Sequence, residues 1–168
     1  MIHRRQVVYL SGGMQYAPGG GASWRSTFRA WAEEALGHRV IDPVKESNKL
    51  MVRWRKKGRV LRGSDRVGGD WPKFFRTIVD RDVDLVINRS DYVVCLWNSG
   101  ARRGAGTQGE LTVARMSRKP VYVVSRTNRT NLPGWVQGCL TEHFSNFADL
   151  QDFLVNQYNH SSKLGARS

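Results

Sequence analysis

The fold is decided by a short apolar stretch that runs directly into glycines, QVVYLSGG at residues 6–13. An uninterrupted apolar run of this length followed by glycine is typical of a buried strand and then a loop. Similar runs recur at residues 92–97 (YVVCLW) and 121–124 (VYVV), and shorter candidates lie at residues 39–41 and 139–144. The sequence therefore predicts five strands.

Helical patterns separate these strands. Residues 24–36 carry apolar side chains at three- and four-residue spacing and stop at Gly37, and we expect further helices at residues 71–90, 105–116 and 146–158. Short apolar strands alternating with helices indicate an α/β protein with a parallel sheet covered on both sides. Ligands bind such sheets at the carboxyl ends of the strands, so the loops after Ser11, Ile41, Trp97 and Val124 are the places to look for a site.

Length and composition predict one compact domain. The chain has 168 residues, 40% of them hydrophobic, and we expect a single domain at residues 1–160, with an insertion at about 45–70 and a flexible tail at 161–168. No apolar run approaches the length of a membrane span and no leader opens the chain, so a cytoplasmic protein is expected. Cys95 and Cys139 form no disulfide framework or zinc motif and are expected in the core.

The chain is strongly basic, with a net charge of +13, and the excess is local. Residues 45–76 hold eleven basic and three acidic residues together with Gly58, Gly63, Gly68 and Gly69, which predicts a mobile loop with one short helix. Three explanations remain open for this charge: a solvated surface, a phosphate-bearing small substrate, or a polynucleotide.

A glycine-rich loop follows the third predicted strand and leads into a helix that begins near Ala105. Gly104, Gly106 and Gly109 spell GxGxxG, but they follow the third strand and lack the acidic residue expected about 20 positions on, which argues against a dinucleotide site. No GxxxxGK[ST] motif is present, so a P-loop is excluded. The expected first turn of the helix carries Thr107 and Glu110, either as a catalytic pair or as plain helix-stabilising residues.

The helix at residues 71–90 places a carboxylate on an apolar face. At 100° per residue, Asp82 falls in the middle of an apolar stripe, whereas Asp84 points the opposite way. The stripe consists of Trp71, Phe75, Ile78, Val79 and Val86. A carboxylate in that position is expected to be functional, or bonded to backbone amides in a structural role.

In this order, four segments resemble the nucleoside 2-deoxyribosyltransferase superfamily: VYLSGG at residues 8–13, SDYVVCL at 90–96, GTQGELTVA at 106–114 and KPVYV at 119–123. The likeness covers roughly residues 6–155 outside the basic insertion. It implies a flavodoxin-like three-layer sandwich with a five-stranded parallel sheet, no metal or other cofactor, and a homodimer or higher homo-oligomer in which a neighbour completes the site. Members exchange the base of 2′-deoxynucleosides, and relatives hydrolyse nucleoside 5′-monophosphates.

Carried over by position, the family's nucleophilic glutamate falls on Glu110, and Thr107 corresponds to a small residue that bonds the sugar or a 5′-phosphate. The family's helix aspartate falls on Val83 by register, which is a departure, and the helical wheel favours Asp82 over Asp84. Gly12, Gly13, Met14 and Gly106 are expected to contact base or sugar. We further infer that Trp24 and Arg25 form a stacking and anion-binding pair.

The expected activity is therefore cleavage of the N-glycosidic bond of a 2′-deoxynucleoside or its 5′-monophosphate, with transfer to a free nucleobase. Hydrolysis is the alternative within the same chemistry. Phosphoribohydrolases carrying PGGxGTxxE share part of the signature, although the proline and first glycine are absent here. A non-catalytic module that binds polynucleotide through its basic segment is the competing class, and no membrane partner is expected.

Overall fold

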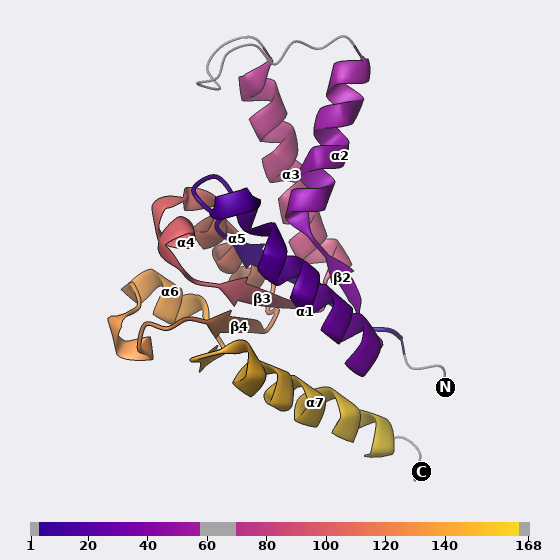
Figure 1. Cartoon of the computed structure of the whole chain (residues 1–168), viewed down its shortest axis with the longest axis vertical. Helices are drawn as coiled ribbons and strands as arrows, with labels where there is room; N and C mark the ends of the chain where they lie inside the picture. The colour runs from indigo at the N-terminus through magenta and orange to yellow at the C-terminus, as the bar shows by residue number, and fades with distance from the viewer. Residues whose placement is uncertain (1–3, 58–69, 165–168) are drawn as a thin grey trace.

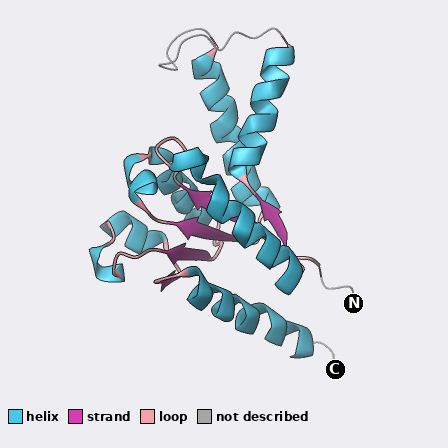
Figure 2. Cartoon of the chain, in the orientation of Figure 1, coloured by secondary structure: helices cyan, strands magenta, loops and turns pink. Residues whose placement is uncertain are grey.

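The computed structural model describes residues 4–57 and 70–164, except for the side chains of residues 159–164. Its centre is a five-stranded, all-parallel sheet made of β1 (Val7–Gly12), β2 (Arg39–Ile41), β3 (Tyr92–Leu96), β4 (Val121–Val124) and β5 (Glu142–Phe144). The strand order β2-β1-β3-β4-β5 is that of flavodoxin-like proteins. The predicted α/β class with a five-stranded parallel sheet is therefore confirmed, and Figure 2 shows the helices around it.

Two separate apolar cores cover the two faces of the sheet. On one face, α1 (Ala22–Ala35) and α7 (Phe147–Leu164) pack through Phe28, Ala32, Leu150 and Leu154. The other face is covered by α3 (Trp71–Arg89), α4 (Ser99–Arg103), α5 (Ala105–Met116) and α6 (Gly134–Cys139). Adjacent residues of a strand point to opposite faces, so both faces of a doubly covered strand are apolar. Cys95 and Cys139 are buried and free, as expected.

The basic segment is largely helical where it is described, which corrects the prediction of a loop. Helix α2 (Pro43–Lys56) begins at Asp42, whose carboxylate accepts a hydrogen bond from Val44 N at 3.0 Å, and Pro43 occupies the first helical position. Glu46 in the first turn and three basic residues in the last turn also favour a helix. These capping signals outweigh the glycines, which begin only at residue 58; residues 58–69 lie outside the described part of the chain.

Helices α2 and α3 project together from the sheet in Figure 1, and we call residues 43–57 and 70–80 the helical arm. A small apolar cluster joins the two helices: the Trp54 and Phe74 ring centroids lie 5.2 Å apart, and those of Trp71 and Phe74 5.6 Å apart. This contact corrects the predicted stripe on α3, because Phe74 is buried while Val79 is 59% exposed. The first half of α3 packs against α2, and only its second half packs against the sheet.

Other boundaries differ locally from the prediction. Residues 139–141 belong to the end of α6 and a turn, so β5 is shorter than expected, and α4 was missed inside the glycine-rich loop. Helix α7 continues to Leu164, past the expected end at Tyr158, and the rest of the predicted tail lies outside the described residues. Two short 3-10 turns, Pro18–Gly21 and Arg129–Asn131, complete the elements of the described residues. No described helix is long and apolar enough to cross a membrane.

Candidate functional site

A cavity of about 560 Å³ lies at the carboxyl end of β1, between the helical arm and the loops that follow β1 and β3. One wall is made by Gly12, Gly13 and Met14 after β1, and another by Gly106, Thr107 and Glu110 of α5. The arm supplies a further wall, with Ser47 and Met51 of α2 and Trp71 and Phe75 of α3, and Asp82 follows further along α3. The cavity is thus at the sheet edge where the topology predicts a ligand.

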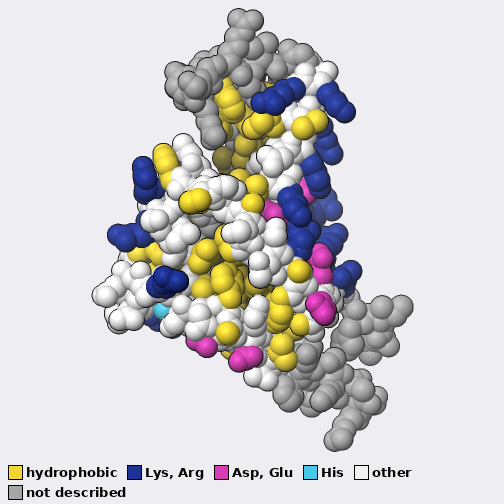
Figure 3. All heavy atoms as spheres, in the orientation of Figure 1, with side chains coloured by type: hydrophobic (Ala, Val, Ile, Leu, Met, Phe, Trp, Pro, Cys, Tyr) yellow, Lys and Arg dark blue, Asp and Glu magenta, His cyan; other side chains and the backbone are white. Residues whose placement is uncertain are grey.

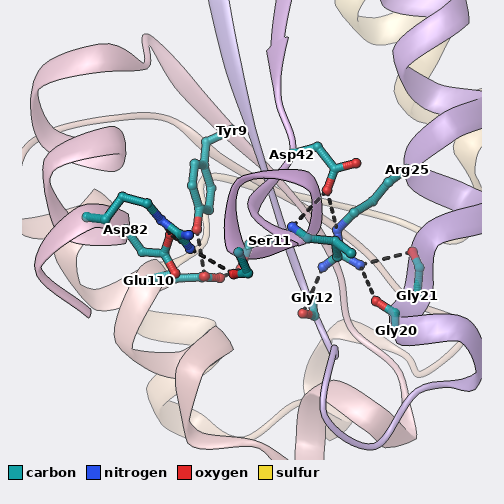
Figure 4. Close-up of polar contacts among 12 residues, drawn as sticks. Tyr9, Ser11, Gly12, Gly20, Gly21, Arg25, Asp42, Asp82 and Glu110 are labelled. Carbon is teal, nitrogen blue, oxygen red and sulfur yellow. Dashed lines mark hydrogen bonds and ion pairs between the residues drawn. The ribbon is translucent and has the colours of Figure 1, made fainter. Parts of the chain in front are cut away.

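Glu110 is fixed in this cavity by two hydroxyl groups of β1. Its Oε1 accepts a hydrogen bond from the Tyr9 hydroxyl at 2.7 Å, and its Oε2 accepts one from Ser11 Oγ at 2.5 Å (Figure 4). Tyr9 and Ser11 alternate along the strand, so both side chains leave the same face of the sheet toward α5. The sequence suggested that Glu110 lies in the first turn of its helix. It is instead the sixth residue of α5, in the second turn.

The surroundings of Glu110 make it easier to protonate than an ordinary carboxyl group. Burial raises the pKa of Glu110 to about 7, against the lowering effect of the hydrogen bonds from Ser11 and Tyr9. The negative charge of Asp82 raises this pKa further, and the Arg25 guanidinium lowers it. At neutral pH the carboxylate is therefore poised between its two forms, as groups at reactive sites often are.

A second carboxylate, Asp82, lines the same cavity and is held by its neighbour Arg81. The Arg81 guanidinium donates to Asp82 Oδ1 from Nε at 2.9 Å and from Nη2 at 2.6 Å, and Nη2 also donates to Ser47 Oγ at 2.9 Å. Burial raises the pKa of Asp82, and the charge of Arg81 opposes that rise. Asp84 instead has a side chain that is 50% exposed and is paired with Arg89, outside this cavity.

Most of the predicted substrate-binding residues line the cavity. Gly12, Gly13, Met14, Gly106 and Thr107 are all there, beside Glu110 and Asp82. Gly13 also has a structural reason to be glycine, because a Cβ at this position would lie 2.4 Å from the carbonyl carbon of Gly100. The loop after β1 therefore packs backbone to backbone against α4, which brings its polar backbone groups to the cavity wall.

Trp24 and Arg25 do not line the cavity, contrary to what the sequence suggested. The Arg25 side chain is fully buried, and its guanidinium donates to the carbonyl oxygens of Gly12 at 2.9 Å, Gly21 at 3.0 Å and Gly20 at 3.2 Å. Figure 4 shows Arg25 turned toward these carbonyls and Asp42. The cation lies in the first turns of α1 and points back at the preceding loop, so it holds that loop in place.

Trp24 is part of the apolar packing between α1 and α7. Its ring stacks on Phe147 with the centroids 5.6 Å apart, and the Arg25 guanidinium lies 4.7 Å from its centroid. Trp24 is therefore a packing residue behind Gly12 and is not among the residues that line the cavity.

Sequence reasoning missed the hydrogen-bond partners of the two carboxylates and the cavity wall formed by the helical arm. Tyr9 and Ser11 were visible as polar groups at alternate positions near the end of an otherwise apolar strand, and that pattern is the available signal. Ser47 and Met51 carried no signal, because the segment that contains them was interpreted as a loop, and Phe75 was identified only as part of an apolar stripe.

The described residues include no group of three or more His, Cys, Asp or Glu side chains placed to hold a metal ion. Gly104 caps α5, whereas Gly106 and Gly109 lie inside it, so GxGxxG does not form a turn from a first strand into a helix. That placement agrees with the sequence argument against a dinucleotide site.

Comparison with known proteins bears on the fold alone. No family model matches the chain, and no curated protein matches it either. Among solved structures, the chain is similar to a conserved protein from Enterococcus faecalis V583, with a TM-score of 0.56 and 13% sequence identity. The alignment covers 91% of this chain and 98% of that one, so the similarity extends over the whole architecture.

Proposed function

We propose that the cavity cleaves the N-glycosidic bond of 2′-deoxynucleosides or their 5′-monophosphates, with Glu110 as the nucleophile and transfer of the deoxyribosyl group to another nucleobase. The observation that carries this proposal is the placement of Glu110, at the carboxyl end of β1, with both carboxylate oxygens held by the hydroxyls of Tyr9 and Ser11. The ordered sequence segments that resemble nucleoside 2-deoxyribosyltransferases support the same assignment.

The reaction proceeds by two displacements at C1′. A Glu110 oxygen forms a bond to C1′ from the face opposite the base, the C1′–N bond breaks through an oxocarbenium-like state, and the base leaves with the electron pair. A nitrogen of a second base then attacks C1′ and releases the Glu110 carboxylate. Water in place of the second base gives hydrolysis, so the two outcomes share every step up to the glycosyl ester.

Asp82 is suited to donate a proton to the leaving base. Because burial raises the pKa of Asp82, its carboxyl form is more populated than that of an exposed aspartate and can donate to the departing base nitrogen. Arg81 counters this effect and keeps the carboxylate form accessible, so that the same group can take the proton of the incoming base. The negative charge of Asp82 also raises the pKa of Glu110.

Incubation with a deoxynucleoside, with and without a second free base, tests the proposal. A new deoxynucleoside detected by chromatography indicates transfer, and free deoxyribose or its 5-phosphate indicates hydrolysis. We expect Glu110→Gln to lose at least a hundredfold in rate, because an amide cannot form the ester. The matched control is Glu33→Gln on α1, whose side chain is 42% exposed. No turnover of any nucleoside or nucleotide, or full activity of Glu110→Gln, contradicts the proposal.

The helical arm supports a second candidate, a module that binds polynucleotide. Figure 3 shows basic side chains gathered along the arm, and Arg53, Arg55, Lys56 and Lys57 at the end of α2 are all exposed. Neutralising phosphates with such side chains makes binding fall steeply with salt. Tight, salt-dependent binding of DNA or RNA together with no glycosidic activity would favour this candidate over the enzyme.

A further inference from the structure

The cavity face of α3 carries a row of apolar side chains, two of them aromatic, that ends at a carboxylate. Trp71, Phe75, Ile78 and Asp82 recur at steps of four, three and four residues, which places them on one side of the helix, and all four line the cavity. At 1.5 Å per residue, Ile78 lies about 6 Å and Phe75 about 10 Å along the helix axis from Asp82. The cavity therefore extends well beyond the level of the carboxylates.

The aromatic part of this row is held in place but open to the cavity. Phe75 stacks on Trp71 with the ring centroids 5.5 Å apart and the planes at 21°, while Trp71 packs edge-on against Phe74. Phe75 itself remains 38% exposed. A large aromatic side chain that lines a cavity and keeps this much surface exposed gains free energy by stacking on a flat ligand.

The opposite wall of the cavity is polar in character. It is made mostly of glycines from the loop after β1 and from the start of α5, together with Thr107. Glycines expose backbone amide and carbonyl groups, which match the hydroxyls and ring oxygen of a sugar better than they match a planar base. Glu110 lies on this polar side and Asp82 at the end of the apolar row, so the bond to be broken belongs between the two walls.

We propose that Phe75, Trp71 and Ile78 on α3 form the subsite for the nucleobase, and that this subsite selects purines over pyrimidines. The inference rests on the proposed function and adds the class of base to it. A single-ring base placed at the level of Asp82 reaches only Ile78, whereas a two-ring base continues to the open face of Phe75. Arm residues thus determine which base is accepted, and the glycine wall holds the sugar.

The first test compares kcat/KM for 2′-deoxyadenosine and 2′-deoxycytidine in the wild type and in Phe75→Ala. We expect the wild type to prefer the purine, and Phe75→Ala to lose about tenfold or more on the purine with little change on the pyrimidine, as expected for loss of one stacking contact. Phe75→Tyr should restore the ratio, because it restores the ring. A loss of folded protein lowers kcat/KM for both substrates by the same factor and leaves the ratio unchanged.

The matched control is Val79→Ala, one turn further along α3, where the side chain is 59% exposed and does not line the cavity. It should leave the ratio at the wild-type value. Calorimetric titration of free adenine and free cytosine into Glu110→Gln adds a readout that needs no turnover: adenine should bind more tightly, and Phe75→Ala should remove the difference.

The outcomes separate the two proposals. A purine-to-pyrimidine ratio that Phe75→Ala leaves unchanged, or equal binding of the two free bases, overturns the subsite while Glu110-dependent turnover leaves the enzyme proposal standing. Absence of turnover in the wild type overturns the proposed reaction, and the base titration then still decides whether the α3 face binds purines.

Discussion

Glu110 should destabilise the folded protein at neutral and alkaline pH, and replacing it by glutamine should reveal this cost. Burial raises the pKa of Glu110 from 4.5 to about 7 in the fold, so the folded state binds a proton more tightly than the unfolded chain does. For a carboxyl group shifted in this direction, stability is greatest below the unfolded pKa and is lost as the pH rises through about 7. Glutamine keeps the shape of the glutamate side chain but cannot ionise.

The size of the effect follows from the two pKa values. A difference of one pKa unit corresponds to about 1.4 kcal/mol, and the part of the shift that titrates between about pH 5.5 and about pH 8 amounts to about 2 kcal/mol. For a domain of this length, about 2 kcal/mol moves the melting temperature by about 4–8 °C. The free energy of unfolding of Glu110→Gln should therefore rise relative to that of the wild type by about 2 kcal/mol between about pH 5.5 and about pH 8.

Urea unfolding of both proteins across this pH range measures the difference. Glu33→Gln, with a side chain 42% exposed on α1, removes the same charge and is the matched control. The reasoning would be refuted if the free energies of unfolding of Glu110→Gln and the wild type differed by a constant amount from about pH 5 to about pH 8. Such a result would mean that Glu110 has the same pKa in the folded and unfolded chains.

Three further predictions concern the surroundings of Glu110 and the loop after β1. The pH profile of kcat/KM should rise through about pH 7 as Glu110 ionises, and Tyr9→Phe should move this limb to higher pH because it removes a hydrogen bond that lowers the pKa of Glu110. Asp82→Asn should move the limb of its residual activity to lower pH, since the charge of Asp82 raises that pKa. Gly13→Ala should destabilise the fold by about 1–3 kcal/mol in urea unfolding. Gly109→Ala should be neutral or stabilising, because beyond the neighbouring residues and backbone of its own helix no atom lies within 4 Å of the added Cβ.

The centre of the sheet could be predicted from the sequence because β1, β3 and β4 are buried on both faces and read as continuous apolar runs. Residues 92–97 and 121–124 needed no tertiary information, since both neighbouring layers demand the same residue type at every position. Helix α2 was not predicted at its full length, for the opposite reason. It contacts the rest of the molecule through few apolar residues, among them Trp54, and its basic surface resembles a solvated loop unless the capping signals at Asp42 and Pro43 are weighed first.

The candidate site was predictable where chemistry coincides with chain position. Glu110 and Asp82 stand out because a carboxylate among glycines or on an apolar face requires an explanation, and the structure brings both to one cavity. Arg25 shows the limit of this reasoning. An arginine next to a glycine loop has the composition of an anion site, yet three carbonyl oxygens of that loop already occupy its guanidinium, and only coordinates reveal such a contact.

The helical arm contributes more to the site than an apolar wall. Arg81 links helices α2 and α3 at the level of the carboxylates. One nitrogen, Nη2, donates both to Asp82 on α3 and to Ser47 on α2, so the position of α2 enters the hydrogen bonding that opposes the effect of burial on Asp82. The charge of Asp82 in turn raises the pKa of Glu110. Packing within the arm is therefore connected to the ionisation of Glu110 by two successive electrostatic contacts, and a substitution that separates α2 from α3 acts on both carboxylates at once.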